Sequence, residues 1–462
     1  MPAAAPEEDE LGWKFGKVES TSRRICEIVR TSGYGGAATR RRAPRNLGIL
    51  LLPSESGALS SPCSFDAEQA YQQTQALCFP RRVGSFGERR AACLIHRRFN
   101  ALGLACWRER FTVSFFPAEI GSRLVFLACA GLVLLTALAA EAQPLLAAAT
   151  AALAALLVNA PWRVQRFLGR NWRPRATSEN LFATLPQAPK GAPARVVFLA
   201  HYDTKSQWLP TGVRVLLVTL TAGACALLAA ACLAAVLGLP EARDALQPGR
   251  VALAVLGMLG GLLLNFTGNR SPGALDNGAA VGTLLELARC WRPRPGAPVE
   301  VVWVATGSEE VELDGARHLL EAHADWWQDR PTLVINLESV GAGARVFLAG
   351  EPTALVLARA VAAELDFEQA PLSVLGAGMD HEPFAARGLP AVSILGDVVR
   401  SSFALHSRRD DMRRVQRPAL ERAGRLAAEL AWRWAHLHQS AARVLVEEPA
   451  PLPTPLIVAP PG

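Results

Sequence analysis

Histidine and carboxylate residues recur along the 462-residue chain, several of them directly after short apolar segments. These residues are His201, Asp203, Asp276, Glu309, Glu310, Glu338 and His406. Two adjacent carboxylates after a buried segment repel each other unless a proton or a cation compensates their charge. Imidazole and carboxylate together suit zinc in sites that leave one position open for water. Two zinc ions that share one carboxylate, roughly 3.5 Å apart, would relieve the repulsion between Glu309 and Glu310.

Each of these residues, taken alone, has an ordinary structural explanation. His201 and Asp203 lie two positions apart on an extended segment, so Asp203 can hold the second ring nitrogen of the imidazole. A neighbour could equally satisfy a histidine at a strand end, and Asp276 could simply cap the helix predicted over 278–289. Only the whole set, following successive strands, favours a metal site.

The segments between these residues predict an α/β fold. Four nearly continuous apolar runs predict strands covered on both faces, over 195–200, 299–305, 332–336 and 391–395. Helical patterns occupy 278–289, 313–322, 353–365 and 417–438. This alternation is typical of a mixed, mostly parallel sheet sandwiched by helices. Ligands gather at the carboxyl ends of the strands in such sheets, which is where the histidines and carboxylates lie.

Six motifs in order, HYD, LDN, SEE, NLE, MDHEPF and LHS, resemble those of the zinc aminopeptidase family of co-catalytic dizinc exopeptidases. Relatives of that family include the glutamate carboxypeptidases, the glutaminyl cyclases and the inactive transferrin receptors. The resemblance covers about residues 68–440, apart from the long apolar runs described below. Its first part, 76–116, is similar to the family's opening helix with a PR-x-x-GS lead-in.

The resemblance implies a role for each motif residue. The implied zinc ligands are His201 and Glu338 for one ion, Glu310 and His406 for the other, and Asp276 for both. Asp203 would orient His201, and Glu309 would be the general base. Zinc lowers the pKa of bound water to about 7, and an adjacent carboxylate can then take its proton. The resemblance also implies a cis bond between Asp276 and Asn277.

Two residues depart from the family pattern. Glu338 stands where many members carry Asp, and its longer arm can still ligate but shifts the first zinc ion. Leu275 replaces the Asp that commonly precedes the bridging residue, which removes a charge without removing a ligand. Asp380 and His381 resemble a substrate-side segment and are left unassigned.

The function expected from the resemblance is a membrane-anchored zinc metallopeptidase that removes N-terminal residues from peptides. One alternative is a catalytically inactive receptor or binding module of the same fold. Retention of every ligand-type residue and of Glu309 argues against it. A glutaminyl cyclase-like acyl transfer at a single zinc ion is the other alternative, and the sequence discriminates poorly between one zinc ion and two.

The composition argues against several other classes of protein. Half of the residues are apolar, which excludes disorder of the whole chain. The net charge of +7 comes from 48 basic residues, of which only Lys14, Lys17, Lys190 and Lys205 are lysines. They are mostly scattered, without interleaved aromatic residues, so nucleic acid is not an expected partner. The nine cysteines form no CxxC pair, and the sequence does not demand an oxidising compartment.

Four apolar runs without charged residues span 124–140, 144–162, 215–239 and 251–266. A membrane crossing needs roughly 20 apolar residues, so the runs predict two transmembrane hairpins in a lipid bilayer. Buried core helices are the alternative. Arginines concentrate on the peptidase side of the runs, with only Arg243 and Arg250 in the short connections. With four crossings, the positive-inside rule places the peptidase domain in the cytoplasm.

The predicted order of domains follows from these patterns. It is a disordered N-terminal extension (1–66), an N-terminal helical part of the peptidase domain (67–123), a transmembrane hairpin (124–162), the segment with the first catalytic strand (163–214), a second hairpin (215–266), the remaining metal site (267–440) and a Pro-rich tail (441–462). The sequence leaves the oligomeric state open.

Overall fold

The computed structural model describes residues 63–158, 172–186, 191–239, 241, 244, 247–291, 299–372 and 378–446. The predicted N-terminal extension lies outside these ranges as far as residue 62, and the predicted tail lies outside them from residue 447.

An eight-stranded sheet has the order β1-β2-β6-β3-β7-β10-β8-β9. Its strands are β1 (Ala105–Ser114), β2 (Arg175–Thr184), β3 (Arg195–His201), β6 (Glu300–Thr306), β7 (Thr332–Glu338), β8 (Val346–Gly350), β9 (Gln369–Pro371) and β10 (Ala391–Leu395). The pairs β3–β6, β3–β7, β7–β10 and β8–β9 are parallel, and the other three are antiparallel. The four strands predicted from apolar runs are the central ones, and the predicted α/β class with a mixed, mostly parallel sheet is confirmed.

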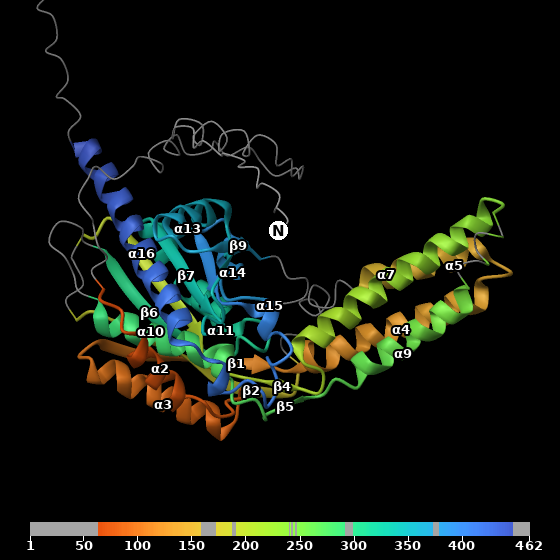
Figure 1. Cartoon of the computed structure of the whole chain (residues 1–462), viewed down its shortest axis with the longest axis horizontal. Helices are drawn as coiled ribbons and strands as arrows, with labels where there is room; N and C mark the ends of the chain where they lie inside the picture. The colour runs from red at the N-terminus through yellow and green to blue at the C-terminus, as the bar shows by residue number, and fades with distance from the viewer. Residues whose placement is uncertain are drawn as a thin grey trace, which may run out of the picture. The chain divides into compact units, whose positions relative to one another are not determined.

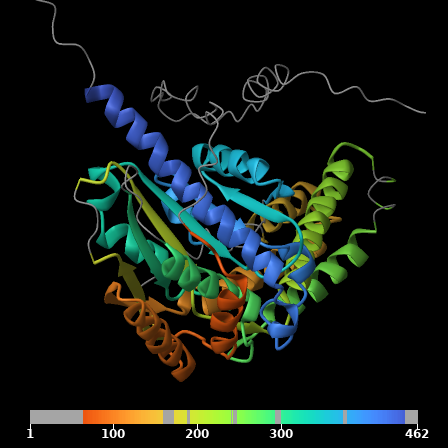
Figure 2. The ribbon, with the colours of Figure 1, turned by 60° about the vertical axis from the view of Figure 1, so that its left-hand side comes forward.

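Helices cover both faces of this sheet (Figures 1 and 2). Val197 and Leu199 of β3 pack with α11 (Asp314–Ala322) and α14 (Glu382–Ala385). Phe198, which points to the opposite face because side chains alternate along a strand, packs edge-on against Trp291. Trp291 directly follows α10 (Ala279–Cys290), which packs with α2 (Ala67–Ala76), α3 (Phe86–Ala101) and α16 (Arg417–Val446). Short elements complete the domain: α12 (Trp326–Asp329), α13 (Pro352–Glu364), α15 (Val398–Ser401), η4 (Met412–Arg414), and the β4–β5 ribbon (Ser206–Gln207, Thr267–Gly268).

The segment predicted as helical, 67–123, also contains strand β1. Trp107, Phe111 and Val113 alternate along it with more polar residues, a period of two that suits a strand. Trp107 stacks on Phe182 of the antiparallel partner β2, at 4.7 Å between ring centroids. Cross-strand packing therefore fixes a strand where the resemblance suggested only a helix.

Four apolar helices pack side by side (Figure 1). They are α4 (Ser122–Ala139, continuous with the π-helix η2, Phe116–Gly121), α5 (Pro144–Val158), α7 (Thr211–Val236) and α9 (Pro248–Leu263). Each of α4 and α7 contacts both α5 and α9. Inside, the hydroxyls of Thr136 and Thr150 lie 2.8 Å apart among small and branched apolar residues.

Two of these helices, 116–139 and 211–236, are long and apolar enough to cross a bilayer, with 24 and 26 residues. The sequence predicts four crossings. The helices α5 and α9 have 15 and 16 residues, about 22–24 Å at 1.5 Å per residue, which is shorter than the ~30 Å hydrocarbon core. Residues 159–162 of the second predicted run lie outside the described residues.

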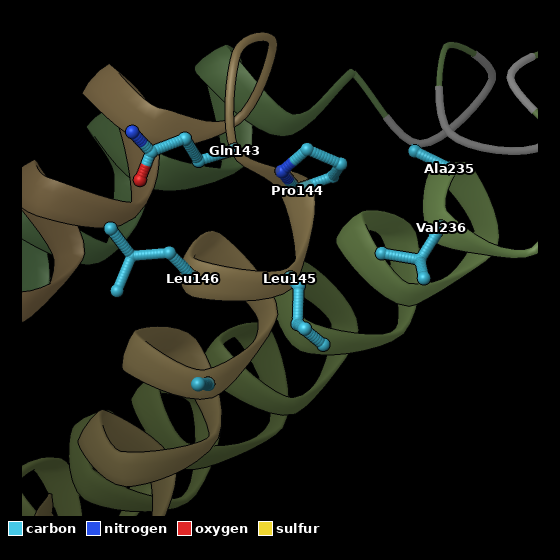
Figure 3. A pocket seen from close by; sticks show the side chains of 7 residues that line it. Gln143, Pro144, Leu145, Leu146, Ala235 and Val236 are labelled. Atoms are coloured by element: carbon cyan, nitrogen blue, oxygen red, sulfur yellow. The ribbon is translucent and has the colours of Figure 1, made fainter.

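A pocket of about 680 Å³ opens between the start of α5 and the end of α7 (Figure 3). Its lining is apolar except for the amide of Gln143. No titratable side chain lines it, so the pocket offers no group for acid–base or metal chemistry.

A disulfide that the sequence analysis did not anticipate links Cys63 to Cys290. It joins the segment before α2 to the last residue of α10. Next to it, the backbone N–H of Asp66 donates to the carboxylate of Glu286 at 2.8 Å. The start of the described chain is thereby fixed to the helix that begins beside Asp276.

Close packing between α2 and α10 should be sensitive to one added methyl group. In Gly282→Ala, the new Cβ would lie 2.4 Å from Thr74 Oγ1 and 2.5 Å from the carbonyl oxygen of Ala70. We expect a loss of about 1–3 kcal/mol of stability, seen as a Tm several degrees lower in a thermal melt of the purified protein.

The matched control is Gly131→Ala in α4, where a Cβ meets nothing within 4 Å. Alanine is favoured over glycine in helices by about 1 kcal/mol, so this variant should melt at or above the wild-type temperature. Equal melting of Gly282→Ala and wild type would contradict the tight contact.

Candidate metal centre

The predicted ligands come from five segments that meet at one edge of the sheet. Two of them, His201 and Glu338, are the last residues of the neighbouring strands β3 and β7. Glu310 lies in the loop after β6, Asp276 in the turn before α10, and His406 in the loop after α15. The side chains meet because parallel strands all end at the same edge.

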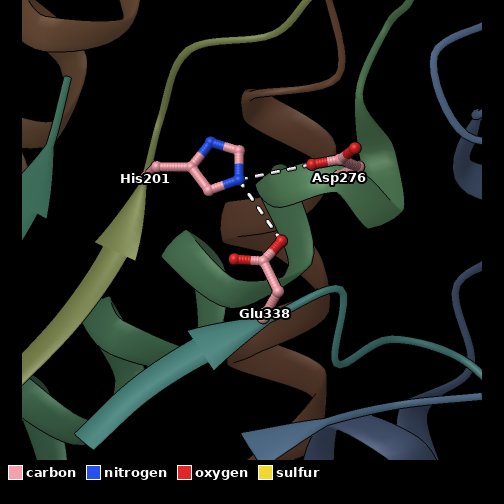
Figure 4. Close-up of side chains that lie close together, drawn as sticks. All are labelled: His201, Asp276 and Glu338. Carbon is pink, nitrogen blue, oxygen red and sulfur yellow. Dashed lines mark hydrogen bonds and ion pairs between the residues drawn. The ribbon is translucent and has the colours of Figure 1, made fainter. Parts of the chain in front are cut away.

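The first group consists of His201, Asp276 and Glu338 (Figure 4). His201 Nε2 lies 3.3 Å from Asp276 Oδ1 and 3.3 Å from Glu338 Oε1. The second group consists of Asp276, Glu310 and His406. His406 Nε2 lies 3.1 Å from Asp276 Oδ2 and 3.1 Å from Glu310 Oε2. The two oxygens of Asp276 therefore face different histidines, as a carboxylate shared by two ions would.

Asp203 connects the first group to the adjacent carboxylates. Its two carboxylate oxygens accept hydrogen bonds from the backbone N–H groups of Glu309 (3.0 Å) and Glu310 (3.1 Å). His201 Nδ1 lies 3.5 Å from Asp203 Oδ1 and 3.3 Å from the Asp203 carbonyl oxygen. One buried carboxylate thus fixes the start of the Glu309–Glu310 loop beside the imidazole that it was expected to orient.

Burial governs the ionisation of this cluster. It raises the pKa of the Glu309 carboxyl well above its ordinary value and also raises that of Glu338. Burial would raise the pKa of Asp276 as well, but hydrogen bonds from the two histidines hold it well below the usual range. At Glu310 burial is opposed by its histidine partner and Lys205, and the pKa is about 2. At Glu309 and Glu338 burial therefore outweighs the opposing effect of His201, whereas at Asp276 and Glu310 the charged partners outweigh burial.

The donor set fits a divalent cation. Glu338 Oε2 is buried and has no hydrogen-bond partner, although a buried carboxylate oxygen normally has one. Each group supplies one imidazole nitrogen and two carboxylate oxygens, a mixture that suits zinc and leaves room for water. The predicted ligand roles themselves stay predictions, with this geometry in their favour.

Comparison with known proteins assigns the chain to a family. Residues 180–431, more than half of the chain, match the sequence profile of peptidase family M28. The chain belongs to peptidase family M28. The matched range runs from β2 into α16 and includes both groups of candidate ligands.

Among individual proteins, this M28 chain is 28% identical to aminopeptidase YwaD of Bacillus subtilis (strain 168) over 167 residues. These are 34% of this chain and 36% of that protein, so the chain spans about a third of the relative's length. The chain is 16% identical to BSAP, a zinc aminopeptidase structure from Bacillus subtilis, covering 80% of this chain and 94% of that one at a TM-score of 0.48. A Fimbriiglobus ruber glutaminyl cyclase is also 16% identical, covering 83% and 99% at a TM-score of 0.48.

Sequence reasoning missed two residues that position Asp276 in the M28 chain. Asp410, buried, accepts hydrogen bonds from the backbone N–H groups of Leu275 (2.7 Å) and Asp276 (3.1 Å). Arg81, also buried, donates to the carbonyl oxygens of Tyr202 (2.7 Å) and Gly273 (2.9 Å). Arg81 belongs to the PR-x-x-GS lead-in, so the family resemblance already pointed to this residue. Asp410 instead lies in a run of charged residues that resembles a solvated surface.

Asn277 joins this turn to the end of β7. The Asp276–Asn277 bond is cis, as the resemblance implied. The Asn277 amide donates to the carbonyl oxygen of Leu337 at 3.0 Å and accepts from the N–H of Ser339 at 2.9 Å. These two residues flank Glu338, so the turn that carries one candidate ligand also holds the strand end that carries another.

Asp380 and His381 belong to neither group. Thr306 Oγ1 donates to Asp380 Oδ2 at 2.5 Å, and the buried His381 contacts Ser393 Oγ at 2.7 Å through Nδ1. Burial raises the pKa of Asp380 to about 7 and lowers that of His381 to about 4. Neither side chain belongs to the two candidate ligand groups, and both stay unassigned.

Asp410 offers a test of how Asp276 is held. In Asp410→Asn one of the two acceptor oxygens becomes an NH₂ group that faces a backbone N–H, so the turn that carries Asp276 should shift. Because Asp276 belongs to both groups, we expect zinc affinity to fall about 10–100-fold, measured by titration of metal-free protein with a competing chelator. Asp411→Asn is the control, since Asp411 instead accepts from the N–H of Arg413. Equal affinities for the two variants would contradict this role.

Proposed function

We propose that this M28 chain is a zinc-dependent aminopeptidase that binds two zinc ions and removes N-terminal residues from peptides. The observation that carries the proposal is the position of Asp276 between two candidate ligand groups, with Glu309 beside them but in neither. The aminopeptidase relative supports the same reaction class. An inactive binding module would have no need for Glu309 at this position.

Zinc, when bound, would supply an activated water and Lewis acidity toward a peptide carbonyl. His201, Asp276 and Glu338 would hold one ion, and Asp276, Glu310 and His406 the other. Glu309 is then the free carboxylate of the cluster, with its Oε2 3.8 Å from His201 Nε2. Burial raises its pKa, and in this proposal it takes a proton and returns it to the leaving amine.

We further propose that α4, α5, α7 and α9 embed the chain in a lipid bilayer. Leucines project outward from the bundle on all four helices, including Leu138 (74% exposed), Leu156 (70%) and Leu253 (72%). A helix that is apolar on every side is either buried in protein or surrounded by lipid. Among the described residues nothing covers these leucines, which favours lipid over a soluble core.

Replacement of Glu309 separates the general base from the ligands. In Glu309→Gln we expect turnover on a peptide panel, measured as released free amino acids, to fall at least ~100-fold. The zinc content per chain, measured by metal analysis, should stay unchanged, because Glu309 is in neither ligand group. Loss of zinc from this variant would mean that Glu309 and Glu310 have exchanged roles.

His406→Ala is the matched comparison, because it removes a proposed ligand. This variant should lose bound zinc. Unchanged zinc stoichiometry there would remove His406 from the site.

The orientation proposed from flanking charge is a cytoplasmic peptidase domain. A fluorescent reporter fused after Arg443 should therefore fluoresce, and a phosphatase that works only outside the cytoplasm should be inactive there. The disulfide between Cys63 and Cys290 argues for the opposite side, since disulfides persist mainly in oxidising compartments. Phosphatase activity, together with resistance of these two cysteines to alkylation, would overturn the cytoplasmic orientation.

A further inference from the structure

The segment that leads from β3 into α7 is tied to the loop that carries His406. The backbone N–H of Gln207 donates to the carbonyl oxygen of His406 at 2.8 Å. Five residues further along the chain, the N–H of Gly212 donates to the carbonyl oxygen of Ser402 at 2.9 Å. A short ribbon with β5 also pairs Gln207 with Thr267, which follows α9. The apolar hairpin of α7 and α9 therefore begins and ends against the candidate metal centre.

Side chains of the same segment face the His406 ring. Thr211 Oγ1, on the first residue of α7, lies 2.9 Å from His406 Nδ1, and Gln207 Oε1 lies 3.2 Å from the same nitrogen. The other ring nitrogen, Nε2, faces Asp276 and Glu310. The imidazole thus lies between the first residue of α7 and the carboxylates of Asp276 and Glu310.

This arrangement selects one form of the ring. A histidine binds metal through a nitrogen that carries no proton, so ligation through Nε2 requires the proton on Nδ1. In that tautomer, Nδ1–H donates to the oxygens of Thr211 and Gln207, which can both accept. His406 also has a φ of 59°, in the left-handed region that non-glycine residues rarely occupy. Such a backbone persists only where its surroundings hold it, and the Gln207 N–H does so here.

Lys205 extends the contact to the other member of the second group. Its ammonium lies 2.7 Å from Glu310 Oε2, and its backbone N–H donates to Glu310 Oε1 at 3.2 Å. By contrast, His201 of the first group has its Nδ1 beside Asp203. The segment that enters α7 thus contacts Glu310 and His406.

We propose that Thr211 and Gln207 are positioning residues that hold His406 in its ligating tautomer, so that the membrane hairpin itself completes the second zinc site. The inference rests on the proposed dizinc function. It makes the hairpin part of the metal centre as well as an anchor. Loss of these two acceptors should weaken the second zinc ion and leave the first bound.

Zinc titration of metal-free, detergent-solubilised protein tests the proposal. Because two oxygens face one nitrogen, either can substitute for the other, so the double variant Gln207→Met/Thr211→Val should show the full effect. We expect its affinity for one of two zinc ions to fall about 10–100-fold, while the other ion stays bound. Thr211→Val alone should give a smaller loss, and Thr211→Ser, which keeps the hydroxyl, should bind both ions like wild type.

Thr136→Val is the structural control, since Thr136 makes its hydroxyl contact with Thr150 inside the bundle. It should bind both zinc ions normally. Wild-type affinity for both ions in the double variant would overturn the positioning role while leaving the dizinc proposal intact, and so would equal loss in Thr136→Val. A wild-type chain that binds fewer than two zinc ions would overturn both proposals.

Discussion

The burial of four carboxyl groups close to one another is the constraint on which the rest of this structure depends. Asp276, Glu309, Glu310 and Glu338 lie together with little exposure, and such a cluster is costly unless cations or directed hydrogen bonds compensate it. The partners that face these carboxylates are His201 and His406, which flank Asp276, and the Lys205 ammonium, which lies 2.7 Å from Glu310 Oε2. Asp203 and Asp410 accept from backbone N–H groups of the loops that carry the carboxylates, and Arg81 donates to the carbonyl oxygens of Tyr202 and Gly273. The carboxylates are thereby held close to one another before any metal binds.

The sequence predicts the parts of this arrangement that depend on local pattern. Strands β3, β6, β7 and β10 were predictable because apolar residues fill both of their faces, and the candidate ligands because they follow those strands or lie in family motifs. The partners of the ligands were not predictable. Thr211 and His406 are 195 positions apart, and a threonine at a helix start is usually a local cap. Asp410 acts on the backbone of Asp276 across 134 positions, a contact that leaves no signature in composition. Helix α9 (Pro248–Leu263) has the same length, 16 residues, as the predicted run 251–266 but begins and ends three residues earlier.

The long apolar insertion interrupts the peptidase fold between two candidate ligands of the first group, His201 and Asp276. An insertion at such a place would disturb the site unless both of its ends were fixed. Here the β4–β5 ribbon closes the base of the insertion, and the side chain of Asn265 accepts from the N–H of Leu209 at 2.9 Å. The insertion therefore leaves and re-enters the domain at one point, and the edge of the sheet that carries the candidate ligands is kept intact.

The shared position of Asp276 has a thermodynamic consequence. A cation that binds through one oxygen of this carboxylate withdraws charge from the other and restricts its rotation, so the two groups cannot bind independently. Linkage requires that the effect be reciprocal: whatever the first ion does to the affinity for the second, the second does equally to the first. Charge withdrawal and repulsion between ions oppose binding of the second, whereas prior ordering of the carboxylate favours it. The sign of the cooperativity would therefore show which of these two opposing effects is larger.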